Sequence, residues 1–283
     1  MLKTTIMVTE STGMLEKEII RQILRKGNCV KIAARDTEEA QSVTRECPVV
    51  HFDFENPRTY SNALKGTSSV FLGFPMNYPR VDDFLLPFME QARFYGVKHI
   101  VGMGIVGENR DSPLMIAEKC LQNCGMNYTI IRPNLFMQFF KELASDGIRR
   151  DSLIQLPAND AKISFVDTRD VAETVADILI REKYQNQMFV LTGAQALNHY
   201  QIADILTNVT GRKIRYKPIS HNQMWKILLE RGYTEQEVEY MVGLYEIARH
   251  GWCENIAQDL GYILGREPTS FEQFAIDHRH EWV

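Results

Sequence analysis

The sequence predicts an α/β fold: a doubly wound parallel sheet with helices on both faces, and a smaller, mainly helical C-terminal lobe. From Thr4 to about Pro133, short apolar runs alternate with longer amphipathic stretches. Strands that alternate with crossover helices form parallel sheets wound on both faces. From about Ala194 onward the segments have helical periodicity, which predicts the second lobe.

Six apolar runs before residue 134 predict the strands of the sheet, because each is short and bounded by charged or turn-forming residues. In order they are TTIMVT, CVKIAA, PVVHF, SVFLGF, HIVGMG and YTIIRP. Two later runs predict further strands, KISFV at 162–166 and QMFVLTG at 187–193.

The stretches between these runs predict helices with recognisable starts and ends. In LEKEIIRQILRK the apolar residues recur at helical spacing, and Gly27 ends the helix. Ser112 and Pro113 open another helix, as an N-cap residue followed by proline in the first turn, and Gly125 closes it. DTRDVAETVADILIRE lies between the two later strands, and four more helical segments fill the C-terminal lobe.

These patterns predict two lobes. Residues 1–134 with 160–193 form the sheet lobe, which is expected to bind a nucleotide. Residues 135–159 with 194–283 form the lobe that is expected to bind the substrate. Ligands of open α/β sheets bind outside the carboxyl ends of the strands, so the expected site is a cleft between the lobes.

Composition and charge exclude several classes of function. The 283 residues carry a net charge of −4 with scattered basic residues, which gives no sign of nucleic-acid binding. No apolar window has the length of a membrane helix, and no signal-peptide pattern is present. Five cysteines without metal-ligand spacing predict reduced thiols, a cytoplasmic location and no metal site. The expected partner is a small molecule, and a homodimer is compatible with the sequence.

Stretches in order along nearly the whole chain resemble the NmrA-like branch of the atypical short-chain dehydrogenase/reductases. They are the VTESTG turn, AARD, HFDFENPRTYSNALKG, VFLGF, GVKHIV, AEKCLQNCGMNYTIIRPNLFM, ISFVDTRDVAETVADIL, FVLTG and LGREPTSFEQFAIDH. The resemblance implies a Rossmann lobe, a small C-terminal substrate lobe and, usually, NADP. Members of this family divide into reductases and cofactor-sensing regulators.

The first turn departs from the family pattern at two positions. Where the resemblance implies TGxTGxxG, the three glycine positions hold Glu10, Gly13 and Glu16. Glycines there let the backbone approach a pyrophosphate at a helix N-terminus, and a carboxylate repels it. Two interpretations stay open. Either both glutamates point to solvent and favour the start of the helix, or the loop supplies its own anion where a phosphate would lie.

The resemblance assigns the other cofactor contacts to Thr12 and Gly13 in the turn, to Arg35 facing a 2′-phosphate, and to Asp53 and Phe54 beside adenine. A guanidinium suits bidentate recognition of phosphate. A solvated loop charge or a core residue at a strand end explains these positions equally well. The expected cofactor is therefore either none or NADP.

The groups for hydride transfer are missing from the positions that the resemblance implies. None of the 11 tyrosines has a lysine four positions later, so no Tyr-x-x-x-Lys pair exists. Leu114 replaces a frequent lysine, and Gly104 and Ile105 replace the usual serine pair. GMGIVG (102–107) matches G-x-G-x-x-G but follows the fifth predicted strand, so its glycines are interpreted as enlarging the cleft floor. A relocated anion nest is the alternative.

The segments expected at the cleft are rich in Phe, Met and Leu, which suits a large apolar or aromatic small molecule. The expected lining residues are Phe74, Met76, Gly104, Ile105, Leu114, Phe136, Met137, Phe140, Phe165 and Trp225. The polar groups that offer acid/base chemistry are Tyr78, Asn134 and His221. Each also has a structural interpretation: lid packing for Tyr78, backbone bridging for Asn134 and a helix-start surface residue for His221.

Three functions follow from these observations. The favoured one is a redox-neutral enzyme, a cyclase, isomerase or dehydratase in secondary metabolism for example, that works by orienting its substrate with one acid/base pair. The second is a regulator that binds NADP without turnover, which Arg35 and Asp53 support and Glu10 and Glu16 oppose. The third is a reductase with unconventional catalytic residues.

Overall fold

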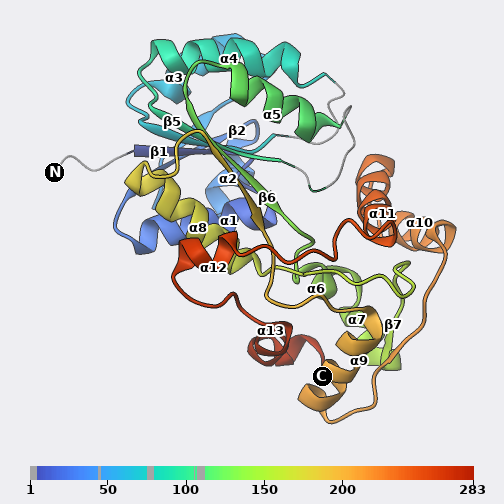
Figure 1. The fold of residues 1–283 in the computed structure, drawn as a ribbon. Helices are drawn as coiled ribbons and strands as arrows, with labels where there is room; N and C mark the ends of the chain where they lie inside the picture. Colours follow the sequence, from blue (N-terminus) through green and yellow to red (C-terminus); the bar gives the residue numbers. More distant parts are fainter. Residues whose placement is uncertain (1–4, 44–45, 75–79, 105, 107–111) are drawn as a thin grey trace. The chain divides into compact units, whose positions relative to one another are not determined.

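A computed structural model describes residues 5–43, 46–74, 80–104, 106 and 112–283 (Figure 1). The strands are β1 (Thr5–Thr9), β2 (Cys29–Ala34), β3 (Val49–His51), β4 (Ser69–Leu72), β5 (His99–Met103), β6 (Asn127–Pro133), β7 (Leu153–Ile154), β8 (Gln187–Leu191) and β9 (Arg215–Tyr216). Within these residues the large sheet has seven strands in the order β3-β2-β1-β4-β5-β6-β8, and β7 pairs with β9. The strand pairs from β3 to β6 are parallel, which confirms the predicted fold class.

By its internal contacts the chain falls into two compact units. The first contains the chain up to Arg132 and Thr168–Phe189, and the second contains Pro133–Asp167 and Val190–Val283. Residues 133–134, 160–167 and 190–193, which the sequence-based boundaries put in the sheet lobe, group with the second unit. The assignment of one lobe to a nucleotide and the other to a substrate stays a prediction, as does the cleft.

Helices cover both faces of the sheet in the first unit. They are α1 (Met14–Arg25), α2 (Thr37–Val43), α3 (Tyr60–Leu64), α4 (Asp82–Phe94), α5 (Pro113–Asn123), α8 (Thr168–Arg181) and the 3-10 helix η1 (Pro57–Thr59). Figure 1 shows α3, α4 and α5 on one face and α1 and α8 on the other. Helix α1 packs against α8, and α4 packs against α3 and α5.

The start and end signals of these helices act as the sequence predicts. Ser112 Oγ accepts a hydrogen bond from the Met115 N–H at 3.2 Å, and Pro113 follows as the first residue of α5. Gly27 and Gly125 have φ of 74° and 68° just after α1 and α5. This left-handed conformation ends a helix and suits glycine, which has no β-carbon to clash.

Strand β1 lies between β2 and β4, where the strand order reverses direction along the chain. Open α/β sheets bind ligands at such a point, outside the carboxyl ends of the strands. Thr9, the last residue of β1, fixes this edge because its Oγ1 donates to the carbonyl oxygen of Gly73 at 2.5 Å. The end of β1 and the first residue after β4 are therefore held side by side.

The second unit is mainly helical. Its helices are α6 (Phe139–Leu143), α7 (Ser145–Asp151), α9 (His199–Thr210), α10 (His221–Glu230), α11 (Glu235–Arg249), α12 (Asp259–Leu264), α13 (Phe271–Asp277) and the 3-10 helix η2 (Arg279–Glu281). Helices α9, α10 and α11 each begin with a capping box, which satisfies N–H groups at the helix start. Their apolar faces close on a core that contains the fully buried Phe274 and Trp282.

One predicted strand is not formed. Residues 162–166 (KISFV) make only isolated bridges, Ile163 with Leu197 and Val166 with Phe136. The N–H of Ser164 donates instead to the carbonyl oxygen of Cys253 at 2.9 Å. Ile163 and Phe165 belong to the buried core of the second unit, so the apolar run reflects burial rather than a strand ladder.

Candidate functional site

The turn between β1 and α1 has a glutamate in a backbone conformation that favours glycine. Glu10 has φ of 53°, a left-handed conformation that costs a residue with a β-carbon roughly 1–2 kcal/mol. The Gly13 N–H donates to the Glu10 carbonyl oxygen at 3.3 Å and closes the turn. Gly13 is also the N-cap residue of α1 and supplies no side-chain cap, so the first N–H groups of the helix need another partner.

The Glu16 carboxyl group folds back over this turn. A β-carbon added to Gly13 would lie 2.1 Å from Glu16 Oε2, and one added to Gly73 would lie 3.1 Å from Glu16 Oε1. The half-buried side chain therefore lies against both glycines. Burial raises the pKa of Glu16 to about 7, a hydrogen bond from its own N–H opposes the rise, and Glu10 adds to it. The position of Glu16 thus matches the second interpretation, in which an acidic group of the loop lies where a phosphate would lie, and the raised pKa leaves this group partly protonated near pH 7.

Two of the predicted adenosine contacts, Arg35 and Asp53, act electrostatically on Glu10. Burial raises the pKa of Glu10, the Arg35 guanidinium opposes the rise, and Asp53 adds to it. Arg35 is exposed directly after β2. A basic side chain predicted to meet a 2′-phosphate therefore already has an acidic neighbour in the free protein.

The other predicted adenosine contacts have structural roles in the first unit. Asp53 Oδ1 accepts a hydrogen bond from the Glu55 N–H at 3.0 Å and stabilises its own turn. Phe54 is 4% exposed, and its ring centroid lies 4.9 Å from that of Phe84. Contacts of Thr12, Gly13, Arg35, Asp53 and Phe54 with a dinucleotide stay predictions.

Gly104, directly after β5, does not open space at the sheet edge. A β-carbon added to it would lie 1.9 Å from Glu118 Oε1 and 3.0 Å from Ile130 Cγ2. Glu118, on α5, is buried and accepts hydrogen bonds from Arg132 Nε at 2.8 Å and Arg132 Nη2 at 2.5 Å. The interpretation that this glycine enlarges the cleft floor is wrong, since the ion pair fills the space.

The rest of GMGIVG gives the same result where it is described. A β-carbon at Gly102 would lie 2.4 Å from Leu121 Cδ1, so helix packing requires this glycine. Helix α5 begins only at Pro113, and residues 105 and 107 lie outside the described residues. Leu114, predicted to line the cleft, is 4% exposed in the core of the first unit.

Asn134 has all its described hydrogen bonds inside the second unit. Its Nδ2 donates to Ser164 Oγ at 2.7 Å and to the Cys253 carbonyl oxygen at 2.9 Å. Its Oδ1 accepts from the Leu135 N–H at 2.9 Å, and the residue is 5% exposed. This arrangement favours backbone bridging over the predicted catalytic role.

His221 is the first residue of α10 and pairs with α11. Its Nδ1 lies 2.9 Å from Glu246 Oε2, and its Nε2 lies 3.2 Å from Arg249 Nη1. Both ring nitrogens are engaged, which favours the interpretation as a structural residue at a helix start. Tyr78, the third polar candidate, lies outside the described residues.

Half of the ten predicted lining residues are large apolar side chains that pack in the cores of the units. Five of them are at most 8% exposed: Phe74, Leu114, Met137, Phe140 and Phe165. Phe136 and Trp225 are half-buried, and Met76 and Ile105 lie outside the described residues. In this structure the five core residues stabilise their units, and a role in holding substrate stays a prediction.

His199, the first residue of α9, is a buried histidine that no sequence signal marks. Its ring centroid lies 5.0 Å from that of Tyr216 and 5.4 Å from that of Phe140. Neither ring nitrogen has a hydrogen-bond partner among the described residues. Burial lowers the pKa of His199 to about 3, so the ring is neutral at physiological pH and packs as an aromatic side chain.

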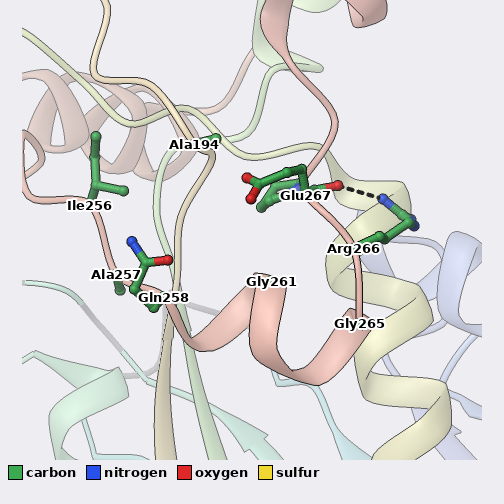
Figure 2. A pocket seen from close by; sticks show the side chains of 9 residues that line it. Ala194, Ile256, Ala257, Gln258, Gly261, Gly265, Arg266 and Glu267 are labelled. Atoms are coloured by element: carbon green, nitrogen blue, oxygen red, sulfur yellow. Dashed lines mark hydrogen bonds between the residues drawn. The ribbon is translucent and has the colours of Figure 1, made fainter.

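Two hollows each lie within a single unit. One, of about 440 Å³ in the second unit, is lined by Ala194, Ile256, Ala257, Gln258, Gly261, Gly265, Arg266, Glu267 and Pro268. Figure 2 shows α12 and the segment after it curving around this hollow, with Arg266 Nη1 donating to the Glu267 carbonyl oxygen at 3.2 Å. The other, of about 320 Å³ in the first unit, lies beside Phe54, Tyr60 and Arg80. The lining of the larger hollow contains no histidine, cysteine or hydroxyl group for catalysis.

Two features, a metal-binding cluster and a membrane-spanning helix, are absent from the described ranges. No group of three His, Cys, Asp or Glu side chains in those ranges is arranged to hold a metal ion. None of the helices there combines the length and the apolar character needed to cross a bilayer.

The chain is similar to known proteins along nearly its whole length. A family model described as the NmrA-like family matches residues 2–275. Prestalk A differentiation protein A of Dictyostelium discoideum is 27% identical over 282 residues, 96% of this chain and 92% of that protein. An NAD(P)H azoreductase of Xenophilus azovorans is 28% identical over 280 residues, 96% of this chain and 97% of that protein. Citrobacter sp. triphenylmethane reductase, crystallised with NADP(H), shares the fold at a TM-score of 0.84 and 21% identity, covering 96% of this chain and 99% of that one.

A dinucleotide does not fit the turn after β1 while Glu16 keeps its position. In turns of this type the diphosphate lies over the glycines, at the N-terminus of the first helix. Here the space that a β-carbon would take at Gly13 already holds Glu16 Oε2. A diphosphate would have to displace the carboxyl group or repel it at short range.

Proposed function

The chain belongs to the NmrA-like family, and on that premise we propose that it is an NAD(P)-dependent oxidoreductase of an apolar or aromatic small molecule. The observation that carries the proposal is the family match over residues 2–275. A relative of nearly equal length, named NAD(P)H azoreductase, supports the reaction type. The dinucleotide would lie at the carboxyl end of β1, beside Gly13 and Arg35.

Reduction of a conjugated acceptor agrees with the absence of a Tyr-x-x-x-Lys pair. That pair supplies a proton to an alkoxide as it forms from a carbonyl group. Hydride addition to a cationic, conjugated carbon gives a neutral product, so such an acceptor does not require a proton donor on the protein. Orientation of the two reactants then contributes most of the catalysis. We therefore place the substrate among conjugated, electron-poor compounds.

A redox-neutral enzyme of the cyclase, isomerase or dehydratase type is the second candidate. The position of Glu16 against Gly13 and Gly73 favours it, because that position leaves no room for a diphosphate. In that case the family fold would hold an apolar substrate without a dinucleotide.

Titration of the full chain with NADPH, followed by calorimetry, tests the two candidates. The oxidoreductase proposal expects binding at or below micromolar concentrations, and loss of NADPH absorbance when an azo dye is added. Absence of binding at millimolar NADPH would contradict it and favour the redox-neutral enzyme. Binding without turnover of any acceptor would favour the regulator.

Arg35→Ala sharpens this titration. If Arg35 contacts the 2′-phosphate, the substitution weakens NADPH binding by about 10- to 100-fold and leaves NADH binding unchanged. Arg25→Ala, at the exposed end of α1, removes the same charge elsewhere and serves as the control. Equal effects of the two substitutions would remove Arg35 from the proposed site.

A further inference from the structure

The Glu16 carboxyl group occupies a seat that is built by two separate turns. Gly13 bounds it from the start of α1, and Gly73 bounds it from the end of β4. The β-carbon that would meet Glu16 at Gly73 would also lie 3.1 Å from the Thr9 carbonyl oxygen. We call the space bounded by Gly13, Gly73 and Thr9 the seat. Side chains on either glycine would fill it, so both positions keep it open for one acidic group.

Helix capping alone does not account for this arrangement. Glu16 is the third residue of α1, a position where a glutamate stabilises the helix start. A cap requires contact with the first turn of its own helix, whereas Glu16 also lies against Gly73 on a neighbouring strand connection. The Ser11 hydroxyl in the same turn is 1% exposed and has no partner among the described residues. A buried hydroxyl without a partner leaves this turn with one unused donor.

Burial in the seat brings the pKa of Glu16 close to neutral pH. Among the described residues, the ionisable groups that act on it are Glu10 from the turn and Lys17 from α1. Glu10 is itself influenced by Arg35, Asp53 and Glu39. Burial is the largest cause of the raised pKa of about 7. The neutral carboxyl is therefore the form that the seat prefers.

We propose that Glu16 is a plug for the diphosphate seat, held in the seat in the free protein and released to solvent when a dinucleotide enters. This inference rests on the proposed function, since it takes the ligand to be NAD(P). In this proposal Glu16 affects binding of the cofactor and takes no part in hydride transfer. Movement of Glu16 out of the seat also explains how a chain with the family fold can have a glutamate where the family pattern has a glycine.

The sign of the pH effect follows from the two positions of the side chain. In the seat the pKa is about 7, and in solvent a glutamate side chain titrates near a pKa of 4.5. The seated form is thus favoured at low pH and loses stability as the pH rises from about 4.5 to 7. Binding of NADPH should strengthen over this range and then level off.

Calorimetric titration of the full chain with NADPH, from about pH 5.5 to about pH 8, tests the plug. We expect the wild-type affinity to rise about 20- to 30-fold over this range. Glu16→Ala should bind tightly without that pH dependence, and Glu16→Gln, which mimics the neutral plug, should bind weakly throughout. Glu38→Gln, on the exposed face of α2, removes the same charge away from the seat and should behave as wild type.

Proton release gives a readout that does not depend on activity. Titrations in buffers of different ionisation enthalpy at about pH 6 should show about 0.9 more proton released per NADPH by the wild type than by Glu16→Ala. The difference between the proteins cancels the titration of the nucleotide itself. A helix cap that never leaves its place predicts no such difference.

The outcomes separate this proposal from the proposed function. If wild type and Glu16→Ala bind NADPH equally well with the same pH profile, the plug is wrong and the oxidoreductase proposal stands. If neither protein binds millimolar NADPH at any of these pH values, the proposed function is wrong and the plug with it. Loss of folding in Glu16→Ala would show in the circular dichroism spectrum. In that case the NADPH affinity of Glu16→Gln, which keeps the shape of the side chain, tests the plug, and a wild-type pH profile for this variant would contradict it.

Discussion

Two glutamates in the first unit each place a carboxyl group against a glycine near the C-terminal ends of the strands. They differ in the charged groups around them. Glu118 fills the space at Gly104 and forms two hydrogen bonds with the guanidinium of Arg132. Glu16 fills the space at Gly13 and forms no ion pair among the described residues, with only the neighbouring Lys17 as a nearby cation.

The difference indicates which carboxyl group is fixed and which one can move. A buried carboxylate with a bidentate arginine is held by two charge-assisted hydrogen bonds, and separating the pair leaves a charge without a partner. A carboxyl group whose pKa is raised by burial gains hydration when it ionises, so its charged form favours solvent. We therefore interpret the Gly104 site as permanent structure and the Gly13 site as exchangeable.

The largest expected effect is loss of the Glu118 partner. Arg132→Leu leaves the Glu118 carboxylate, whose side chain is 2% exposed, without its cation. We expect the free energy of unfolding to fall by about 3–5 kcal/mol, measured by urea denaturation. Combining Glu118→Leu with Arg132→Leu should recover part of this loss, because no charge then stays buried. A loss below about 1 kcal/mol for Arg132→Leu would show that the pair is weakly held.

Alanine at the two glycines compares the rigidity of the two sites directly. Gly104→Ala places a β-carbon 1.9 Å from an atom of the fixed ion pair, and we expect a destabilisation of about 1–3 kcal/mol. Gly13→Ala meets the end of a flexible side chain at 2.1 Å, and its φ of −63° suits alanine. Gly13→Ala should therefore lower the free energy of unfolding by less than about 1 kcal/mol. Equal losses in thermal or urea unfolding would contradict the assignment of Glu16 as the movable group.

The pH dependence of stability gives the smallest expected effect. Burial raises the pKa of Glu16 to about 7, so its contribution is most favourable below about pH 4.5 and is lost as the pH rises through about 7. Relative to Glu16→Gln, the wild type should lose about 1–2 kcal/mol over this range, less than the full shift implies because the side chain can reach solvent. Urea unfolding of both proteins at several pH values measures the difference. If the free energies of unfolding of the two proteins change with pH in the same way, the Glu16 carboxyl group lies in solvent.

Most of the fold could be predicted from the sequence because the signals are local. The apolar runs, the Ser112–Pro113 helix start and the terminal glycines act within a few residues of where they stand. The failure at KISFV (162–166) has a long-range cause, since Ser164 bonds to Cys253 far along the chain. No local pattern distinguishes an apolar strand from an apolar segment that packs into a helical core.

The candidate site was predicted less completely, because its chemistry depends on which side chains meet. The sequence marks Glu10 and Glu16 as departures, but it cannot tell that Glu16 turns back onto Gly13 and Gly73. It also gives no sign that Gly104 makes room for Glu118. A missing side chain in a sequence therefore does not identify open space, since a residue from another element can fill it.

The route of the chain through the first unit affects how that unit can be produced. The chain leaves the unit after Arg132 and returns at Thr168, where α8 begins. Helix α8 packs on α1, in which Ile19 and Ile23 are buried. On the ribosome, α1 therefore waits for a partner that emerges much later, and its apolar face has to be shielded in the nascent chain until then. A soluble fragment of the first unit would have to splice Arg132 to Thr168, because truncation after Arg132 removes α8.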